Sequence, residues 1–377
     1  MSWWKPEKVQ KAQVMVVGAG ALGNEVLKNL ALMNVGHILI VDFDIIEYAN
    51  LCRSVLFRES DLEVERKKAE VAAERIREIN PNVKVMTIHG DIGVDVGLGI
   101  FRRMDAIIGC LDNRLARLFI NQLAFKVNKP WIDGAIQNLI GWSTVYWPGK
   151  SCYQCGLTES EEQHIRSQLS CADIAERYAS AGRVPTTPVI SSIIGGVQVQ
   201  EALKLIHGNE KQSLAGQIFY YEGHSNTTLQ FKSDPLKEFC ESHFPFDEII
   251  EAAELGAEST LAELFAWLQA RFPGQDLHLE LDHGLVTKVS GAESEKEHEV
   301  IISKPHFSEA EQRKYQSVPG EILHFEDVIQ TISSSFQRSD LRLREIGIPP
   351  LHILTIVSGQ ETYFVELTGD LTYLNYS

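Results

Sequence analysis

Short apolar runs alternate with amphipathic stretches through the first half of the chain. The apolar runs and their flanks predict strands at 14–17, 38–41, 83–88, 106–111 and 131–135. Apolar positions at helical spacing predict helices at 21–33, 63–78 and 115–127. Because strands and helices take turns along the chain, we predict an α/β fold with a Rossmann-like, mostly parallel sheet and helices on both of its faces.

The first domain is expected to span residues 1–245. Residues 141–148 and 216–231 predict further strands, and residues 185–206 predict a long helix. Residues 156–184 are polar and rich in small side chains, which is typical of a loop that crosses the surface.

The last third of the chain has a different character. Residues 246–377 predict a small α+β module, with an amphipathic helix at 260–272 and a hairpin formed by 277–281 and 285–289. From residue 241 onwards there are 24 acidic and 9 basic residues, so this part holds −15 of the net charge of −16. A surface this acidic is a poor nucleic-acid binder and suits a basic protein partner; a surface that is merely soluble is the alternative.

A glycine-rich turn joins the first predicted strand to the first predicted helix. Gly18, Gly20 and Gly23 form a Gly-x-Gly-x-x-Gly pattern, in which the first glycine allows a tight turn and the second allows a phosphate to approach the backbone. The next strand ends at Asp42 and Asp44, where an acidic side chain can bind ribose hydroxyls. The pattern predicts a nucleotide site and, taken alone, favours an enzyme that uses NAD or FAD.

Further polar residues follow at intervals that a nicotinamide enzyme does not need: Asn50, Arg53, Lys68, Asp112, Asn113, Arg117 and Asn121. Their spacing resembles that of the ThiF/MoeB and ubiquitin-activating enzyme superfamily over about residues 14–208. The chain is most similar to a compact bacterial activating enzyme of a ubiquitin-like conjugation system. For Asp112 and Asn113, capping of the following helix is an alternative role that is compatible with metal binding.

The resemblance implies a reaction and a set of roles. Enzymes of this superfamily use ATP and Mg²⁺ to adenylate the C-terminal carboxylate of a small β-grasp protein that ends in a free glycine. The glycine-rich turn would hold the nucleotide, and Asp44, with Asp42 as the second candidate, would hold the ribose. The remaining implied roles are phosphate contacts from Asn50, Arg53 and Lys68, and Mg²⁺ coordination by Asp112 next to Asn113.

The cysteines suggest metal binding and catalysis. Cys152 and Cys155 form a Cys-x-x-Cys pair, and the superfamily has a second such pair after the long helix, where this chain has Cys240 and His243. Three cysteines and one histidine suit a structural, tetrahedral zinc site. Unmetallated thiols, and a surface role for His243, are the alternatives.

Cys171 lies in the loop in which ubiquitin-type activators have their thioester cysteine, although its distance from the following Pro185 is longer than is usual there. A thiolate at this position could attack the acyl adenylate. Cys52 and Cys110 are interpreted as non-catalytic.

The resemblance also implies partners. The C-terminal module looks like the ubiquitin-fold domain that recruits a conjugating enzyme, with an unrelated accessory domain as the alternative. Superfamily members are dimers, so we expect a homodimer. Members send an arginine from an N-terminal helix to a second subunit's ATP; here Lys5, Lys8 or Lys11 would replace it, and absence of that role is the alternative.

We therefore predict an activating enzyme that adenylates a ubiquitin-like protein, forms a thioester at Cys171 and passes the modifier to a conjugating enzyme. A sulfur-carrier adenylyltransferase without an obligatory thioester, and an inactive scaffold subunit, are the alternatives. No stretch approaches the roughly 18 consecutive apolar residues of a membrane helix, and we expect a cytoplasmic protein with no membrane or nucleic-acid partner.

Overall fold

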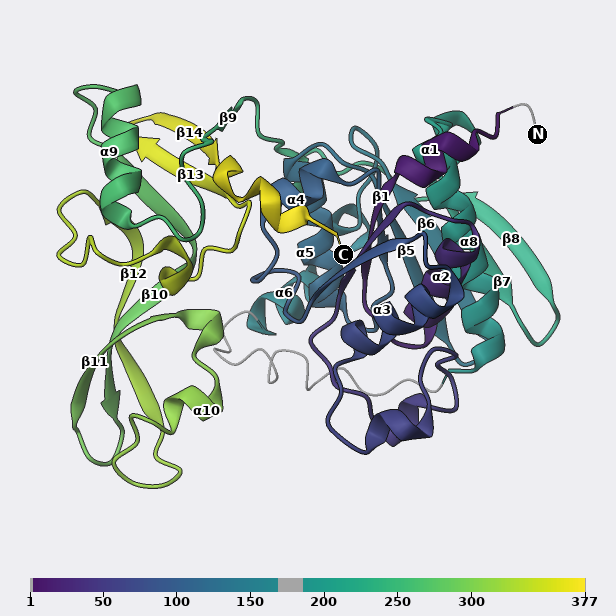
Figure 1. Cartoon of the computed structure of the whole chain (residues 1–377), viewed down its shortest axis with the longest axis horizontal. Helices are drawn as coiled ribbons and strands as arrows, with labels where there is room; N and C mark the ends of the chain where they lie inside the picture. Colours follow the sequence, from purple (N-terminus) through teal and green to yellow (C-terminus); the bar gives the residue numbers. More distant parts are fainter. Residues whose placement is uncertain (1–2, 169–185, 377) are drawn as a thin grey trace.

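The computed structural model describes residues 3–168 and 186–376. Within this part of the chain, one large sheet and one smaller sheet form two neighbouring bodies (Figure 1). The large sheet has the strand order β3-β2-β1-β4-β5-β6-β7-β8. Its strands are β1 (Gln13–Val17), β2 (His37–Val41), β3 (Lys84–Ile88), β4 (Ala106–Gly109), β5 (Trp131–Gln137), β6 (Ile140–Tyr146), β7 (Gln217–Glu222) and β8 (Thr227–Lys232).

The large sheet is parallel from β3 to β5 and antiparallel from β5 to β8. Alternate residues of β1 enter two separate cores: Val14 and Val16 pack on one face, and Met15 and Val17 on the other. Burial on both faces is the reason that the strand reads as an unbroken apolar run. The predicted Rossmann-like, parallel-rich sheet is thus confirmed, together with an antiparallel half.

Helices cover both faces of this sheet. The first core contains side chains of α2 (Ala21–Leu32), α3 (Lys68–Ile79) and α8 (Pro188–Ile206), and the second contains those of α4 (Leu98–Arg103) and α5 (Arg114–Lys126). By length and composition α8 passes the test for a membrane-spanning helix, but it packs against α2, β5 and β6 as a core helix does. Of the short helix α1 (Pro6–Lys11), Val9 enters the first core, whereas Ile165 of α6 (Glu159–Gln168) packs in a separate small cluster with Leu115 and Leu118.

The predicted helix at 63–78 begins five residues later, at Lys68. Residues 63–65 form a turn, and the two residues before Lys68 then pair with the segment after β2: Ile46 N–H donates to Arg66 O, and Lys68 N–H donates to Asp44 O. Val64, which the periodicity placed on a helix face, is 65% exposed. This pairing matters for function, since it brings Lys68 next to Asp44.

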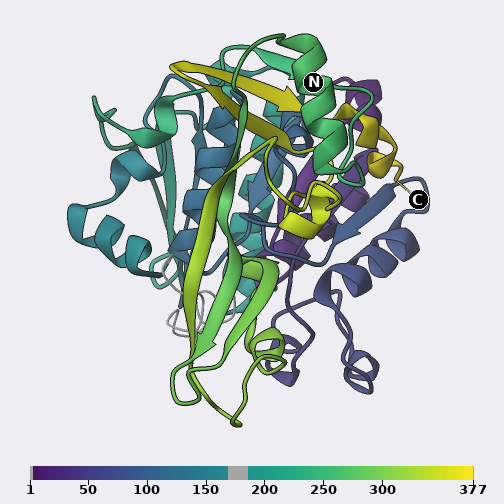
Figure 2. The ribbon, with the colours of Figure 1, turned by 90° about the vertical axis from the view of Figure 1, so that its left-hand side faces the viewer.

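The C-terminal module has its own sheet in the order β11-β10-β13-β14-β9, with β12 also paired to β10 (Figure 2). Its elements are β9 (Ile249–Glu251), α9 (Leu261–Arg271), β10 (His278–Gly291), β11 (Glu297–Ser303), α10 (Glu309–Gln312), β12 (Leu323–Ser333), β13 (Ile353–Ser358) and β14 (Glu361–Glu366). The predicted hairpin at 277–289 is wrong. That segment is one continuous strand, since β12 pairs with it on both sides of Gly284, while β13 pairs with residues 278–280.

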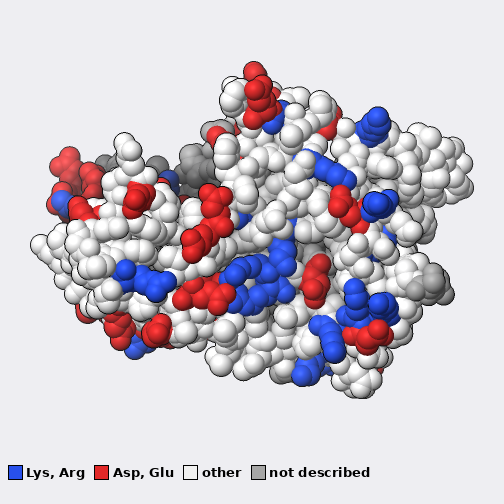
Figure 3. Space-filling model, turned by 90° about the horizontal axis from the view of Figure 1, so that it is seen from above, with Lys and Arg blue, Asp and Glu red and all other residues white. Residues whose placement is uncertain are grey.

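Polar and apolar contacts join the module to the first body. The carboxylate of Glu366 is fully buried and pairs with both Arg102 and Arg103 at the end of α4. The rings of Phe246 and Phe364, whose centroids are 3.7 Å apart, pack against the second core of the first body. On the face seen from above, Figure 3 shows a group of basic side chains near the middle, with acidic side chains on either side. The domain boundary at residue 245 stays a prediction.

Candidate functional site

The glycine-rich turn at the end of β1 leaves no room for side chains at two of its glycines. Gly18 has φ +94°, and a Cβ there would lie 2.6 Å from Cys110 O. A Cβ at Gly23 would lie 2.0 Å from Gly18 O. By contrast, a Cβ at Gly20 would have no other atom within 4 Å. Gly20 is the N-cap of α2, and no side chain caps this helix. The first N–H groups of α2 are therefore available to an anion.

Two carboxylates and a buried lysine lie beside this turn. Asp42 accepts hydrogen bonds from Ala19 N–H (2.6 Å) and Asp44 N–H (2.8 Å). Lys68, only 8% exposed, places its Nζ 2.5 Å from Asp44 Oδ2. Burial raises the pKa of Asp42, and the charge of Lys68 opposes that rise. The arrangement is a cation next to two acids at the edge where the glycine turn lies.

The segment after β2 carries the predicted phosphate ligands Asn50 and Arg53. Asn50 is buried, and its Oδ1 accepts a hydrogen bond from Glu47 N–H (2.8 Å), which holds the one-turn helix Tyr48–Asn50. Arg53 is half-buried and forms no ion pair with any other described residue. Its guanidinium is thus a positive charge that no acidic side chain in the described part of the chain neutralises.

Sequence reasoning missed the residue that ties this segment to the glycine turn. Asn24 on α2 is fully buried; its Nδ2 donates to Ala19 O (2.7 Å) and Gly20 O (3.0 Å), and its Oδ1 accepts from Leu56 N–H (2.8 Å). A polar residue on the inner face of an otherwise apolar helix was the available signal.

Asp112 and Asn113 follow β4, the strand next to β1 in the sheet. Asn113 is the N-cap of α5 and accepts a hydrogen bond from Ala116 N–H (2.7 Å), so the predicted capping role is confirmed. Asp112 is exposed and has no hydrogen bond or ion pair with the residues that the structure describes. Since β2, β1 and β4 are adjacent and parallel, their carboxyl ends bring Asp44, the glycine turn and Asp112 to one edge of the sheet.

The predicted zinc ligands come together although 84 residues separate their two halves. Ligand atoms of Cys152, Cys155, Cys240 and His243 all lie within 4.8 Å of one another. Cys152 Sγ is 3.6 Å from the Sγ atoms of both other cysteines, and Cys155 Sγ is 3.4 Å from His243 Nε2. A tetrahedral zinc ion with bonds of about 2.3 Å to sulfur and about 2.0 Å to nitrogen needs separations of about 3.8 and 3.5 Å. The donor set fits structural zinc.

Hydrogen bonds prepare one of these thiols for a cation. Cys155 Sγ accepts hydrogen bonds from the Cys152 thiol and from Lys237 N–H. These two hydrogen bonds lower the pKa of Cys155 to about 4, although burial acts in the opposite direction. Donation to Cys155, together with burial, raises the pKa of Cys152. Cys110 is buried in the sheet and its pKa is raised by that burial, while Cys52 is exposed beside Arg53.

Cys171, the predicted thioester cysteine, lies outside the described residues. The part that precedes it ends with α6. The part that follows begins at Thr186, which bridges to Asn138 at the end of β5.

Comparison with known proteins decides the family. A family profile described as "ThiF family" matches residues 5–242, more than half of the chain. The chain belongs to the ThiF family.

The ThiF resemblance inferred from the residues is thus confirmed. The chain is 30% identical over 234 residues to "Adenylyltransferase and sulfurtransferase MOCS3" of Culex quinquefasciatus, which covers 62% of this chain and 50% of that protein. It is 28% identical over 235 residues to "SAMP-activating enzyme E1" of Haloferax volcanii, covering 62% of this chain and 82% of that protein. This ThiF chain therefore spans about half the length of the MOCS3 relatives that it matches.

Solved structures show the same fold. E. coli MccB, crystallised with ATP, matches with a TM-score of 0.51 and 22% identity over 63% of this chain and 68% of that chain. The ThiF domain here thus has the α/β architecture of MccB.

Proposed function

We propose that this ThiF protein is an ATP-dependent adenylyltransferase that activates the C-terminal carboxylate of a ubiquitin-like, β-grasp protein. The observation that carries the proposal is the meeting of three features at one sheet edge: an uncapped helix N-terminus after the glycine turn, the buried cation of Lys68, and the exposed carboxylate of Asp112. The names of the relatives, which are adenylyltransferases and modifier-activating enzymes, agree with this chemistry.

In the proposed reaction an oxygen of the modifier's terminal carboxylate attacks the α-phosphorus of ATP. A P–O bond forms, the bond to the β-phosphate breaks, and pyrophosphate leaves. Negative charge grows on the phosphates, so Lys68, Arg53 and Asn50 stabilise the transition state by contacts directed at that charge. Asp44, or Asp42 beside it, would hold the ribose. A Mg²⁺ ion at Asp112 would neutralise charge on the leaving pyrophosphate.

A second step is proposed at Cys171. Its thiolate would attack the acyl adenylate, forming a thioester and releasing AMP. The C-terminal module, interpreted as a ubiquitin-fold-like domain, would then recruit a conjugating enzyme through its acidic surface, in the cytoplasm. Zinc at the Cys₃His site would hold the end of the adenylation domain in place and take no part in the chemistry.

A sulfur-carrier adenylyltransferase is the second candidate. It is favoured by the relatives whose names combine adenylyltransferase with sulfurtransferase. An inactive scaffold is disfavoured, because a scaffold has no use for a buried lysine and a free arginine at a nucleotide site.

A homodimer is part of the proposal. An apolar groove of about 560 Å³ lies over α2 and α8 and is lined partly by Trp3, Trp4 and Leu203. Leu32 and Val189, on the same two helices, are each 65% exposed. A second copy of the chain would cover this surface, with Lys5, Lys8 and Lys11 of α1 close to the contact.

Two assays test the proposal. Incubation with ATP and the modifier, followed by a non-reducing gel, should give an adduct that dithiothreitol removes and that Cys171→Ala abolishes. Pyrophosphate exchange without any adduct would favour the sulfur-carrier function. Lys68→Ala should abolish the exchange, and normal exchange in that variant would remove Lys68 from the mechanism.

A further inference from the structure

One face of α5 carries a row of polar side chains that runs from the nucleotide site to the zinc ligands. Asn113, Arg117 and Asn121 are spaced four residues apart, so they lie one above the other on the helix. Asn113 adjoins the nucleotide site, and Arg117 and Asn121 are buried in the protein. Buried polar side chains at this spacing are costly unless each has partners, and here each has several.

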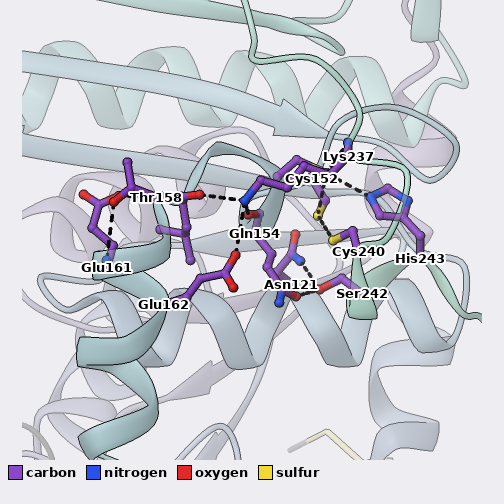
Figure 4. A network of polar contacts seen from close by, with 12 residues as sticks. Asn121, Cys152, Gln154, Thr158, Glu161, Glu162, Lys237, Cys240, Ser242 and His243 are labelled. Atoms are coloured by element: carbon purple, nitrogen blue, oxygen red, sulfur yellow. Dashed lines mark hydrogen bonds and ion pairs between the residues drawn. The ribbon is translucent and has the colours of Figure 1, made fainter.

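Asn121 bridges the two halves of the four-ligand site (Figure 4). Its Oδ1 accepts from Tyr153 N–H (3.0 Å), between the first two cysteines, and from Trp131 Nε1 (3.2 Å). Its Nδ2 donates to Ser242 Oγ (2.9 Å), between the last two ligands. Ser242 in turn donates to Gln154 Oε1 (2.6 Å), which closes a ring of contacts around the ligands.

Arg117, one turn earlier, contacts both the segment that follows β4 and the interior of β5. Its Nε donates to Asp133 Oδ1 (3.0 Å), and its Nη2 donates to Leu111 O (2.5 Å) and Gly134 O (3.3 Å). Leu111 directly precedes Asp112. The guanidinium therefore holds the peptide group next to the proposed Mg²⁺ ligand.

We propose that this polar row on α5 couples the zinc site to the nucleotide site, with Asn121 and Arg117 as positioning residues that set the place of Asp112. The inference rests on the proposed function for the role of Asp112. When zinc holds its four ligands, Tyr153 and Ser242 fix the side chain of Asn121. This contact fixes the rotation of α5 about its axis and its position along that axis. Arg117 then transfers that position to Leu111 and Asp112.

The physical basis is that the polar contacts of α5 with the zinc-ligand segments and with Leu111 are buried or partly buried. Loss of zinc would let the two halves separate, and Asn121 would lose one side of its partners. A shift of α5 by a fraction of an ångström then moves Asp112 out of the position at which it coordinates the ion. A site that served only as a clamp would lower stability on zinc loss and leave Mg²⁺ affinity unchanged.

Three variants separate these cases. Ser242→Ala removes one hydroxyl of the ring and leaves all four ligands. Arg117→Lys keeps a positive charge near Asp133. Its single ammonium group lacks the planar guanidinium that contacts both Leu111 and β5. Gln122→Ala, on the same helix and half-buried, is the matched control.

Two measurements are made on each full-length, zinc-loaded protein. The rate of zinc release to a chromophoric chelator reports the zinc site. The second measurement is the apparent dissociation constant of Mg²⁺ in the presence of ATP, called the Mg²⁺ constant below. It is measured by calorimetry without any modifier and reports on Asp112. We expect Ser242→Ala to release zinc about 10–100-fold faster and to raise the Mg²⁺ constant severalfold. Arg117→Lys should raise the Mg²⁺ constant severalfold at an unchanged rate of zinc release, and Gln122→Ala should match the wild type in both.

The coupling is refuted if Ser242→Ala speeds zinc release while both it and Arg117→Lys keep the wild-type Mg²⁺ constant. Zinc stripping of the wild type adds a further readout, because the coupling predicts a raised Mg²⁺ constant with secondary structure retained by circular dichroism. ATP binding needs no modifier, so normal binding without pyrophosphate exchange would count against the proposed function and not against the coupling.

Discussion

Asn24 provides a direct test of what holds the glycine-rich turn of the proposed nucleotide site in place. Its side chain is fully buried and makes three hydrogen bonds: two to the carbonyls of Ala19 and Gly20 in the glycine turn, and one from Leu56 N–H in the segment that carries Arg53. The variant Asn24→Ala removes all three bonds at once. It leaves the backbone of α2 unchanged, since alanine is a good helix former.

The expected loss follows from the partners that are left behind. Leu56 N–H is buried and would have no acceptor, which costs about 1–3 kcal/mol. Together with the small void in the core, we expect Asn24→Ala to lower the free energy of unfolding by about 2–3 kcal/mol. If ATP must restore the order between the two segments, the same energy is lost from binding, which corresponds to an ATP affinity about 30–160-fold weaker.

Urea unfolding and calorimetric ATP titration measure the two effects. Asn29→Ala, on the same helix and half-buried, is the matched control and should change stability by less than about 0.5 kcal/mol with normal ATP affinity. Loss of stability with unchanged ATP affinity would refute the idea that Asn24 positions the nucleotide turn.

Three further predictions concern other contacts. Glu366→Gln should lower the free energy of unfolding by about 3 kcal/mol, because it leaves Arg102 and Arg103 without their buried partner, whereas Glu251→Gln, 55% exposed, should cost less than about 1 kcal/mol in the same urea titration. Burial raises the pKa of Asp282, but the hydrogen bond and the charge of His352 outweigh that effect and hold the pKa below its usual value of about 3.9. The stabilisation is therefore present above that value and is lost progressively as the pH falls below it, so Asp282→Asn should flatten the dependence of the free energy of unfolding on pH, measured from pH 6 to 3. His243→Ser should increase the rate of zinc release at least tenfold in the chelator assay.

Much of the first body could be predicted because its signals are local. Strands buried on both faces read as apolar runs, as in β1, and the glycine pattern marks the turn at which only small residues fit. The four zinc ligands were also predictable: Cys152 and Cys155 have the spacing of metal ligands, and the family resemblance pointed to Cys240 and His243 as the second pair.

Long-range pairing explains the failures. The start of α3 was misplaced because residues before Lys68 pair with the segment after β2, which periodicity within the helix does not show. The predicted hairpin between 277–281 and 285–289 is a single strand because β12 pairs with it on both sides of Gly284. Asn24, Arg117 and Asn121 gain their roles from partners that are distant in sequence, so composition and spacing gave no account of what they bind.

The most direct test of the central claim is ATP–pyrophosphate exchange with the modifier present. The account predicts that the wild-type chain exchanges label only when the modifier has a free C-terminal carboxylate, and that amidation of that carboxylate stops the exchange. Lys68→Met, which keeps the length of the side chain but not its charge, should slow the exchange at least 100-fold. Exchange that proceeds equally with the amidated modifier, or at the wild-type rate in Lys68→Met, would contradict the account.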